Sequence, residues 1–356
     1  MVSGVPDVSA PAPAGPLSAY TTLRIGGPAA RLITATTEEQ IVASVREATR
    51  AGTPTLVLAG GSNVVVSDAG FPGTVVLLRS SGFTVDRSPS AVDLTVQAGA
   101  AWDELVAATV ESGWAGIECL SGVPGSTGAT PIQNVGAYGQ EVAETITTVR
   151  VYDRVTDEVV TLRAGECGFG YRTSRFKHSD RWVVLAVRFR LTPSPMSTPI
   201  RYAELARTLG VPLGGTAPLA EVREAVLELR AKKGMVVDET DPDTHSVGSF
   251  FTNPVLAAAE YADLVDRAGG EPPSWPGEDG TVKVSAAWLI EKAGFGKGYG
   301  HGNGVAISGK HTLALTNRGG GTAEALLALA REIRDGVHER FGVTLRPEPV
   351  LVNCAL

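Results

Sequence analysis

Apolar residues recur at helical intervals in four stretches of the chain. The first follows Thr36–Glu39, which has the spacing of a capping box, and it stops at Gly52. Other helices are expected to start near Trp102, to span Leu219–Lys233, and to begin after a cap at Thr322. The apolar positions that carry the period are Ile41, Val42, Val45 and Ala48 in the first helix, Val222, Val226 and Leu229 in the third, and Leu326, Leu329, Ile333 and Val337 in the last.

Short buried runs and alternating runs predict β-strands between and after these helices. The expected strands are Thr55–Ala59, Val64–Val66, Thr74–Leu78, Val92–Ala98, Thr148–Val160 and Val183–Leu191. The first 191 residues are therefore expected to form an α/β or α+β region that is rich in strands. Phe341–Leu351 is also predicted as a strand, and Pro347 and Pro349 would limit it to a sheet edge or an irregular end.

Two segments show neither the helical nor the strand period of apolar residues. Residues 1–17 contain no Lys or Arg and no sustained apolar core, so they are predicted to be a disordered tail and not a secretory signal. Thr192–Pro199 is rich in proline and serine and is the best candidate for a domain boundary.

Composition narrows the function classes. The chain has 356 residues, of which 43% are hydrophobic and 19% charged, and no apolar run approaches the ~18 residues of a spanning helix, so no membrane insertion is expected. Lys and Arg total 31 against 38 Asp and Glu, a net charge of −7 that makes a broad nucleic-acid surface a poor expectation. The three cysteines and five histidines show no metal-ligand spacing, so no metal is expected, and the unpaired cysteines suit a reducing cytoplasm.

The most informative segment is the glycine-rich loop from Ser121 to Gly139. Its glycines allow the backbone N–H groups to approach an anion, and Ser126, Thr127 and Asn134 add side-chain partners. Tyr138 adds a flat ring. The loop is therefore predicted to wrap a phosphate-bearing cofactor, with a glycine-rich surface loop as the alternative.

A second glycine element, Gly60–Asn63, follows a predicted buried strand and suits a pyrophosphate. Alone it is only a turn signal, but two such elements together would hold one long nucleotide. Two nucleotide motifs fail elsewhere: Gly294–Gly304 lacks the sixth-position glycine of a dinucleotide fingerprint, and His311 stands where a phosphate-binding P-loop needs a hydroxyl.

Three further segments carry candidate chemistry. Cys167–His178 groups aromatic and cationic residues, so Arg172 is either an anion-binding fork or part of a solvated basic turn. Ser249 precedes a Phe-Phe pair and is either a positioned proton donor or a buried structural serine. Glu348 is held between two prolines and would otherwise be an ordinary loop carboxylate.

Taken in order, these segments resemble the UDP-N-acetylenolpyruvoylglucosamine reductase family, in particular its branch with a substrate-loop tyrosine. The resemblance covers nearly the whole chain. The motifs that carry it are Thr22–Gly27, Ala59–Asn63, Gly122–Gly128, Gln133–Gly139, Phe169–Arg172, Gly248–Pro254, Ala287–Glu291 and Pro347–Glu348.

The resemblance implies an α+β protein with an FAD-binding fold of the vanillyl-alcohol-oxidase type and a C-terminal α+β domain that binds substrate. It implies FAD-dependent oxidoreductase activity in peptidoglycan synthesis, in which NADPH reduces the flavin and UDP-N-acetylglucosamine enolpyruvate is reduced to UDP-N-acetylmuramate. The implied division is a tail at 1–17, FAD-binding subdomains at 18–85 and 86–200, a substrate-binding domain at 201–326, and a C-terminal helix and strand at 327–356 that carry Glu348.

The resemblance also implies roles for individual residues. Arg172 and Glu348 would stabilise charge on the substrate carboxylate, and Ser249 would donate the proton. The implied cofactor-binding residues are Gly60, Gly61, Ser62, Asn63, Gly125, Ser126, Thr127, Gly128, Ala129, Asn134, Gly136, Ala137, Tyr138 and Arg230. The implied substrate contacts are Tyr171, Tyr202, Lys233, Asn253, Lys297 and His311, with Lys232 as an alternative to Lys233.

Some implications stay open at this point. Val350 stands where some family members have an arginine, so any cofactor contact of that arginine is lost or supplied elsewhere. A flavin oxidase of the same fold and a non-catalytic nucleotide-binding protein are the competing interpretations. The preference for NADPH over NADH comes from the resemblance alone, as do a monomeric state and roles in cell-wall biogenesis, cell shape, cell division and the cell cycle. A cytoplasmic location is expected from the unpaired cysteines as well as from the resemblance.

Overall fold

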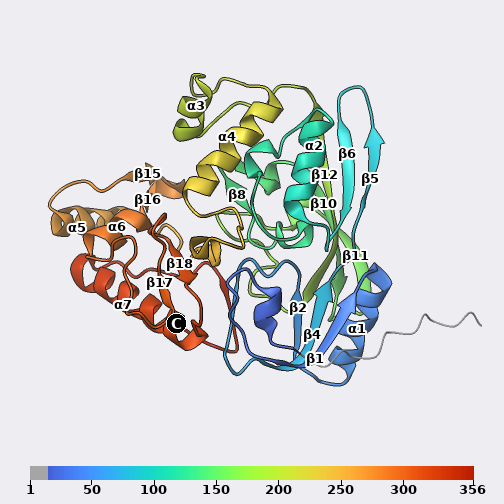
Figure 1. Cartoon of the computed structure of the whole chain (residues 1–356). Helices are drawn as coiled ribbons and strands as arrows, with labels where there is room; N and C mark the ends of the chain where they lie inside the picture. Colours follow the sequence, from blue (N-terminus) through green and yellow to red (C-terminus); the bar gives the residue numbers. More distant parts are fainter. Residues whose placement is uncertain (1–14) are drawn as a thin grey trace, which may run out of the picture. The chain divides into compact units, whose positions relative to one another are not determined.

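The computed structural model describes residues 15–356, coloured by sequence in Figure 1. The tail predicted for residues 1–17 therefore lies outside the described residues except for its last three, of which Leu17 is fully buried. The chain forms two compact units that each draw on separate segments. The first unit comprises residues 15–16, Pro28–Gly60 and Phe71–Leu229, and the second comprises Leu17–Gly27, Gly61–Gly70 and Arg230–Leu356.

The first unit begins with a small parallel sheet. Its strands are β1 (Ala29–Ala35), β4 (Phe71–Leu78) and β2 (Thr55–Leu58), in the order β1-β4-β2. Helix α1 (Glu38–Arg50) buries Ile41 and Val45 against it. The cap of α1 is Thr37 and not Thr36: the Thr37 hydroxyl accepts a hydrogen bond from the Gln40 N–H.

A larger antiparallel sheet forms the centre of this unit. Its strand order is β11-β10-β12-β6-β5, and the strands are β5 (Phe83–Arg87), β6 (Val92–Gln97), β10 (Ile146–Asp153), β11 (Glu158–Arg163) and β12 (Trp182–Pro193), with β7 (Trp114–Ala115) pairing with the end of β12. Helix α2 (Trp102–Glu111) packs on it through Trp102, whose ring centroid lies 5.8 Å from that of Phe189. Both side chains are fully buried, so this contact anchors the start of α2.

The glycine-rich loop occupies the region between β7 and β10 and contains only short elements. These are the 3-10 turns η2 (Glu118–Leu120), η3 (Thr127–Ala129) and η4 (Val142–Glu144) and the strand pair β8 (Gly136–Ala137) and β9 (Gln140–Glu141). A further turn, η5 (Ala164–Glu166), follows β11. Helices α3 (Ala203–Leu209) and α4 (Leu219–Lys232) come after β12, and α4 lies next to α2 (Figure 1), to which the Asp103–Arg223 ion pair joins it.

The second unit contains three small sheets and three helices. The sheets are β19 (Val350–Val352) with β3 (Val64–Val66), β13 (Ser246–Ser249) with β18 (Ala314–Asn317) and β17 (Val305–Ile307), and β14 (Val255–Leu256) with β16 (Val282–Val284) and β15 (Ser274–Pro276). The helices are α5 (Ala258–Ala268), α6 (Ala286–Lys292) and α7 (Ala323–Phe341), and the short turns are η1 (Leu17–Tyr20), η6 (Pro242–Thr244) and η7 (Glu278–Gly280). The buried face of α7 packs Leu326, Ile333 and Val337 into the core of this unit.

The predicted helices and strands are confirmed, with three corrections. The run predicted as one strand over Thr148–Val160 is the hairpin β10–β11. The strand predicted over Phe341–Leu351 is wrong for most of its length, because Phe341 ends α7, Gly342 caps it with φ +71°, and only Val350–Val352 pair in a sheet. The third correction is the cap of α1 at Thr37. Among residues 15–356, no helix is long and apolar enough to cross a membrane.

Candidate active site

Gly60, the first residue of one predicted cofactor element, meets the glycine-rich loop in the first unit. A Cβ on Gly60 would lie 2.5 Å from Cα and 2.8 Å from the carbonyl carbon of Gly125, so the two backbones are in direct contact. A Cβ on Gly128 would lie 2.5 Å from that of Ala98, which presses η3 onto the end of β6. The absence of side chains at these glycines therefore allows the close approach of three segments.

Backbone hydrogen bonds fix the glycine-rich loop beside the start of α2. The Thr127 and Gly128 N–H groups donate to the carbonyls of Ala100 and Ala98, each at 2.8 Å, and the Trp102 N–H donates to the Gly125 carbonyl at 3.0 Å. Residues 125–128 are therefore held against the strand end in a defined conformation. A preformed backbone of this kind suits the binding of a phosphate group.

Asn134 holds the same loop together from inside. It is 1% exposed and adopts φ +46°, a left-handed conformation that asparagine tolerates. Its side-chain amide donates to the Glu141 carboxylate at 2.7 Å and to the Gly170 carbonyl at 3.1 Å, and its carbonyl accepts from the Ala143 N–H. The structure thus gives Asn134 three partners within the protein, two at residues 141–143 and one at Gly170.

Arg172 is attached to the glycine-rich loop. Its guanidinium donates to the Gly136 carbonyl at 2.7 Å, and its own carbonyl accepts from the Lys177 ammonium at 2.9 Å. Its backbone adopts φ +52°, which is rare for a residue with a long side chain. The guanidinium carbon lies 5.6 Å from the ring centroid of Tyr171, which is 39% exposed. The predicted arginine fork is therefore a half-buried cation held in place by backbone groups.

Tyr138 and Tyr202 lie together. Their ring centroids are 5.3 Å apart, with the planes at 80° in an edge-to-face contact. Tyr202 is 41% exposed and directly precedes α3. A candidate cofactor residue and a candidate substrate residue are thereby neighbours in the first unit.

In the second unit, Gly61 is required by the backbone path. A Cβ there would lie 1.9 Å from the Tyr20 carbonyl oxygen, and its φ is +62°. The backbone carbonyl of Asn63 accepts a hydrogen bond from the Val350 N–H at 3.0 Å, at the point where β19 pairs with β3. Gly61–Asn63 therefore lie beside the segment that follows Glu348.

Ser249 and Glu348 come from segments that run side by side in this unit. The Glu348 N–H donates to the Phe250 carbonyl at 2.8 Å, and Phe251 bridges to Pro347. Phe250 and Phe251 are buried, whereas Ser249 is only partly buried. The structure thus brings together two of the predicted catalytic residues on a rigid apolar base.

Cations gather around His311 in the second unit. Burial is the main cause that lowers the pKa of His311 to about 4, and the positive charges of Lys233 and Lys297 lower it further, with a smaller effect from Arg230. The negative charge of Glu291 raises the pKa of His311 and so opposes these effects. His311 is therefore neutral near pH 7. The cation cluster formed by Lys233, Lys297 and Arg230 can attract a phosphate or diphosphate.

The candidate Asn253 and the motif residue Glu291 contact the two ends of helix α6. The Asn253 side-chain carbonyl accepts a hydrogen bond from the Ala286 N–H at 2.9 Å, so it ties the serine segment to the start of α6. The Glu291 carboxylate, at the other end of that helix, accepts from the Thr312 hydroxyl next to His311. Lys232 is exposed at the end of α4, whereas Lys233 is partly buried.

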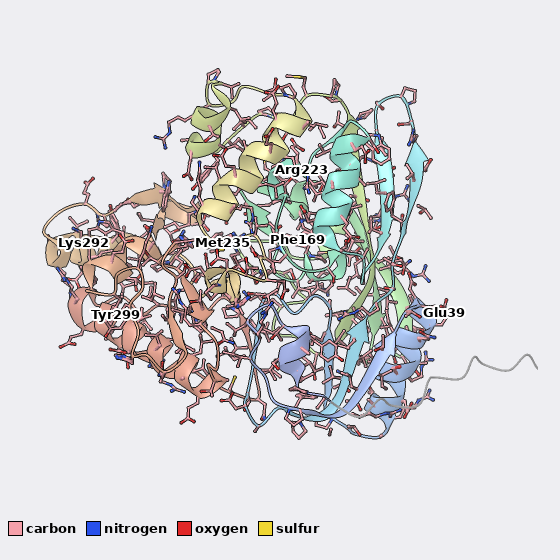
Figure 2. All side chains as sticks on the ribbon, in the orientation of Figure 1. Glu39, Phe169, Arg223, Met235, Lys292 and Tyr299 are labelled. Atoms are coloured by element: carbon pink, nitrogen blue, oxygen red, sulfur yellow. The ribbon has the colours of Figure 1, made fainter. Side chains whose placement is uncertain are left out.

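Sequence reasoning missed how the glycine-alternating loop Gly294–Gly304 is anchored. Phe295 fits a notch at Gly336, where a Cβ would lie 2.6 Å from the Phe295 ring. Tyr299, which Figure 2 labels beside α7, donates to Glu332 at 2.5 Å, and His301 contacts the other oxygen of that carboxylate at 2.7 Å. These contacts leave Lys297 exposed near the loop tip. Side chains far apart in sequence make these contacts, so no local motif marks them.

The thiols are unsuited to nucleophilic chemistry. Burial raises the pKa of Cys119 far above its ordinary value and that of Cys167 to about 11. Burial also raises the pKa of the Cys354 thiol.

Comparison with known proteins gives two family matches and several close relatives. The FAD binding domain family matches residues 29–163, and the family of the C-terminal domain of UDP-N-acetylenolpyruvoylglucosamine reductase matches residues 241–352. Proteins named UDP-N-acetylenolpyruvoylglucosamine reductase are similar over 96% of the chain: one from Salinispora arenicola is 66% identical with 95% of its length covered, and one from Thermobifida fusca is 56% identical with 98% covered. The crystal structure of the reductase of that name from Thermus caldophilus is 27% identical, covers 94% of this chain and 97% of its own, and has a TM-score of 0.65.

Proposed function

Because the chain belongs to the UDP-N-acetylenolpyruvoylglucosamine reductase family, we infer that it reduces the enolpyruvyl group of UDP-N-acetylglucosamine enolpyruvate in peptidoglycan synthesis. It is an FAD-dependent oxidoreductase with the vanillyl-alcohol-oxidase type of FAD-binding fold, and NADPH is the reductant. The observation that carries this conclusion is the 66% identity to a reductase along nearly the whole of both chains.

The residues of the chain fit FAD. The contact between Gly60 and Gly125 leaves no room for side chains where two backbone loops meet, which is the arrangement that a pyrophosphate needs. We propose that Gly60–Asn63 and Gly125–Ala129 hold the cofactor, together with Gly136, Ala137 and Tyr138. Arg230, whose guanidinium donates to the Met235 carbonyl at 2.8 Å, is proposed as a further contact. Since the Asn134 side chain has three partners of its own, its proposed role is to shape the loop around FAD.

Bound FAD would supply the hydride-transfer chemistry between NADPH and the vinyl carbon of the substrate. The protein must then stabilise negative charge that develops next to an existing carboxylate and must protonate the neighbouring carbon. We assign charge stabilisation to Arg172 and Glu348 and proton donation to Ser249. Support comes from the fixed guanidinium of Arg172 and from the backbone hydrogen bond between Glu348 and Phe250.

The cation cluster suits the diphosphate of the UDP-sugar. Lys233, Lys297 and His311 are proposed to bind it, because the two lysine charges act on the same neutral histidine. Lys233 is favoured over Lys232, which is exposed. Asn253, Tyr171 and Tyr202 are proposed as the remaining substrate contacts.

The finer biological context is also part of the proposal. The domain division at 18–85, 86–200, 201–326 and 327–356 is retained as a proposal. So are a monomeric state, a cytoplasmic location, and roles in cell shape, cell division and the cell cycle.

A steady-state assay tests the activity. Purified protein should oxidise NADPH only when UDP-N-acetylglucosamine enolpyruvate is present, and mass spectrometry should find a product two hydrogen atoms heavier than the substrate. An oxidase of the same fold would instead consume oxygen with an alcohol or sugar. NADPH oxidation that is independent of the enolpyruvyl sugar would contradict the proposal.

A further inference from the structure

An ion pair outside the predicted motifs holds the start of the glycine-rich loop. The Asp103 carboxylate, in the first turn of α2, accepts a hydrogen bond from the Gly122 N–H at 2.5 Å. The same carboxylate accepts two hydrogen bonds from the Arg223 guanidinium of α4, at 2.7 and 2.8 Å. One carboxylate thus joins two helices and the loop, and Figure 2 labels Arg223 on α4.

One side of this part of the loop borders open space. A partly open cavity of about 360 Å³ lies here, lined by Asp103, Glu104, Val123, Pro124, Gly125 and Arg223 among others. Gly122 and Gly125 have φ of +69° and +120°. Because glycine has many accessible backbone conformations, the hydrogen bonds of this turn help to select the one observed.

We propose that Asp103 and Arg223 are positioning residues for FAD. Asp103 fixes the Gly122 N–H, and the bidentate contact with Arg223 fixes the carboxylate itself. Gly125 is three residues further along the loop and contacts Gly60, so a displaced turn moves one wall of the proposed pyrophosphate site. If the competent loop is only partly populated, the apparent affinity for FAD falls by that fraction.

The inference rests on the proposed FAD site. Its test is the Kd of FAD for apoprotein, measured by flavin fluorescence for Asp103→Ala, Asp103→Asn and Arg223→Ala. Asp103→Ala should weaken FAD binding by about ten- to hundredfold, the factor that a hydrogen bond to a charged group is worth. Asp103→Asn keeps an acceptor for the Gly122 N–H and should retain part of the affinity.

A matched ion pair controls for stability alone. Asp153 and Arg181 also form a bidentate pair in the first unit, at 2.9 and 2.6 Å, and Asp153 is 3% exposed. Asp153→Ala should lower the melting temperature of the apoprotein while leaving the Kd of FAD unchanged. Equal losses of FAD affinity in the Asp103→Ala and Asp153→Ala variants would mean that the first pair is only structural and would overturn the inference.

Gly60→Ala separates this inference from the proposed site. If Gly60→Ala weakens FAD binding and Asp103→Ala does not, the positioning role is wrong and the site stands. If neither variant changes the Kd, the site itself is misplaced and the inference fails with it.

Discussion

Replacing Gly60 with alanine should weaken FAD binding through a single added methyl group. The new Cβ would lie 2.5 Å from Gly125 Cα, 2.8 Å from its carbonyl carbon and 3.1 Å from the Ser126 nitrogen. All three neighbours are backbone atoms, so no side-chain rotation relieves the clash, and the two loops must move apart. Overpacking of this kind costs about 1–3 kcal/mol, which corresponds to an increase of roughly 5- to 150-fold in the Kd of FAD if the loops separate to fit it.

The assay is titration of apoprotein with FAD, followed by flavin fluorescence and by the flavin content of the purified protein. Gly165→Ala is the matched control, because a Cβ at Gly165 in the same unit meets nothing within 4 Å. Both variants should keep the circular dichroism spectrum of the parent. An unchanged Kd for Gly60→Ala, beside a normal Gly165→Ala, would refute the reasoning that the contact between the two glycine loops shapes the cofactor site.

Three other predictions concern the second unit. Ser249→Ala should slow reoxidation of the reduced flavin by the enolpyruvyl sugar by about 10²–10³ and leave reduction by NADPH intact, in rapid-mixing experiments; slowing of both phases would contradict its role as proton donor. Lys233→Ala should raise KM for the UDP-sugar at least tenfold. Lys232 is the exposed neighbour of Lys233, so Lys232→Ala should change KM little. Equal increases in KM for the two variants would remove the preference for Lys233. The pKa of His311 is lowered to about 4, so between about pH 6.5 and 4 the unfolded chain binds a proton there that the folded protein does not. The free energy of unfolding should therefore fall as the pH drops through this range, by at most about 3 kcal/mol. His311→Gln should reduce this slope in urea titrations at several pH values, and an unchanged slope would show that His311 does not cause it.

Periodicity predicted some elements well, but the long alternating run Thr148–Val160 is a hairpin and not one strand. Helix α7 and strand β12 have sustained periods and follow the predicted ranges closely. The error at Phe341 arose where a helix ends in an apolar residue and a second apolar run follows at once. Gly342, in the left-handed conformation, marks that boundary.

The glycine elements could be found from sequence because backbone approach to an anion leaves a local trace. The ion pair between Asp103 and Arg223 leaves none, since the two residues are 120 positions apart and each is an ordinary charge on a helix. The same is true of Glu332, which holds Tyr299 and His301 from α7. Side chains that position a site through tertiary contacts become visible only once the fold brings them together.

Anaerobic stopped-flow absorbance of the FAD-loaded protein tests the central claim most directly. NADPH should bleach the visible absorbance of the oxidised flavin, and the colour should return only when UDP-N-acetylglucosamine enolpyruvate is added. A flavin that NADPH does not bleach, or that stays reduced when the enolpyruvyl sugar is added, would contradict the account.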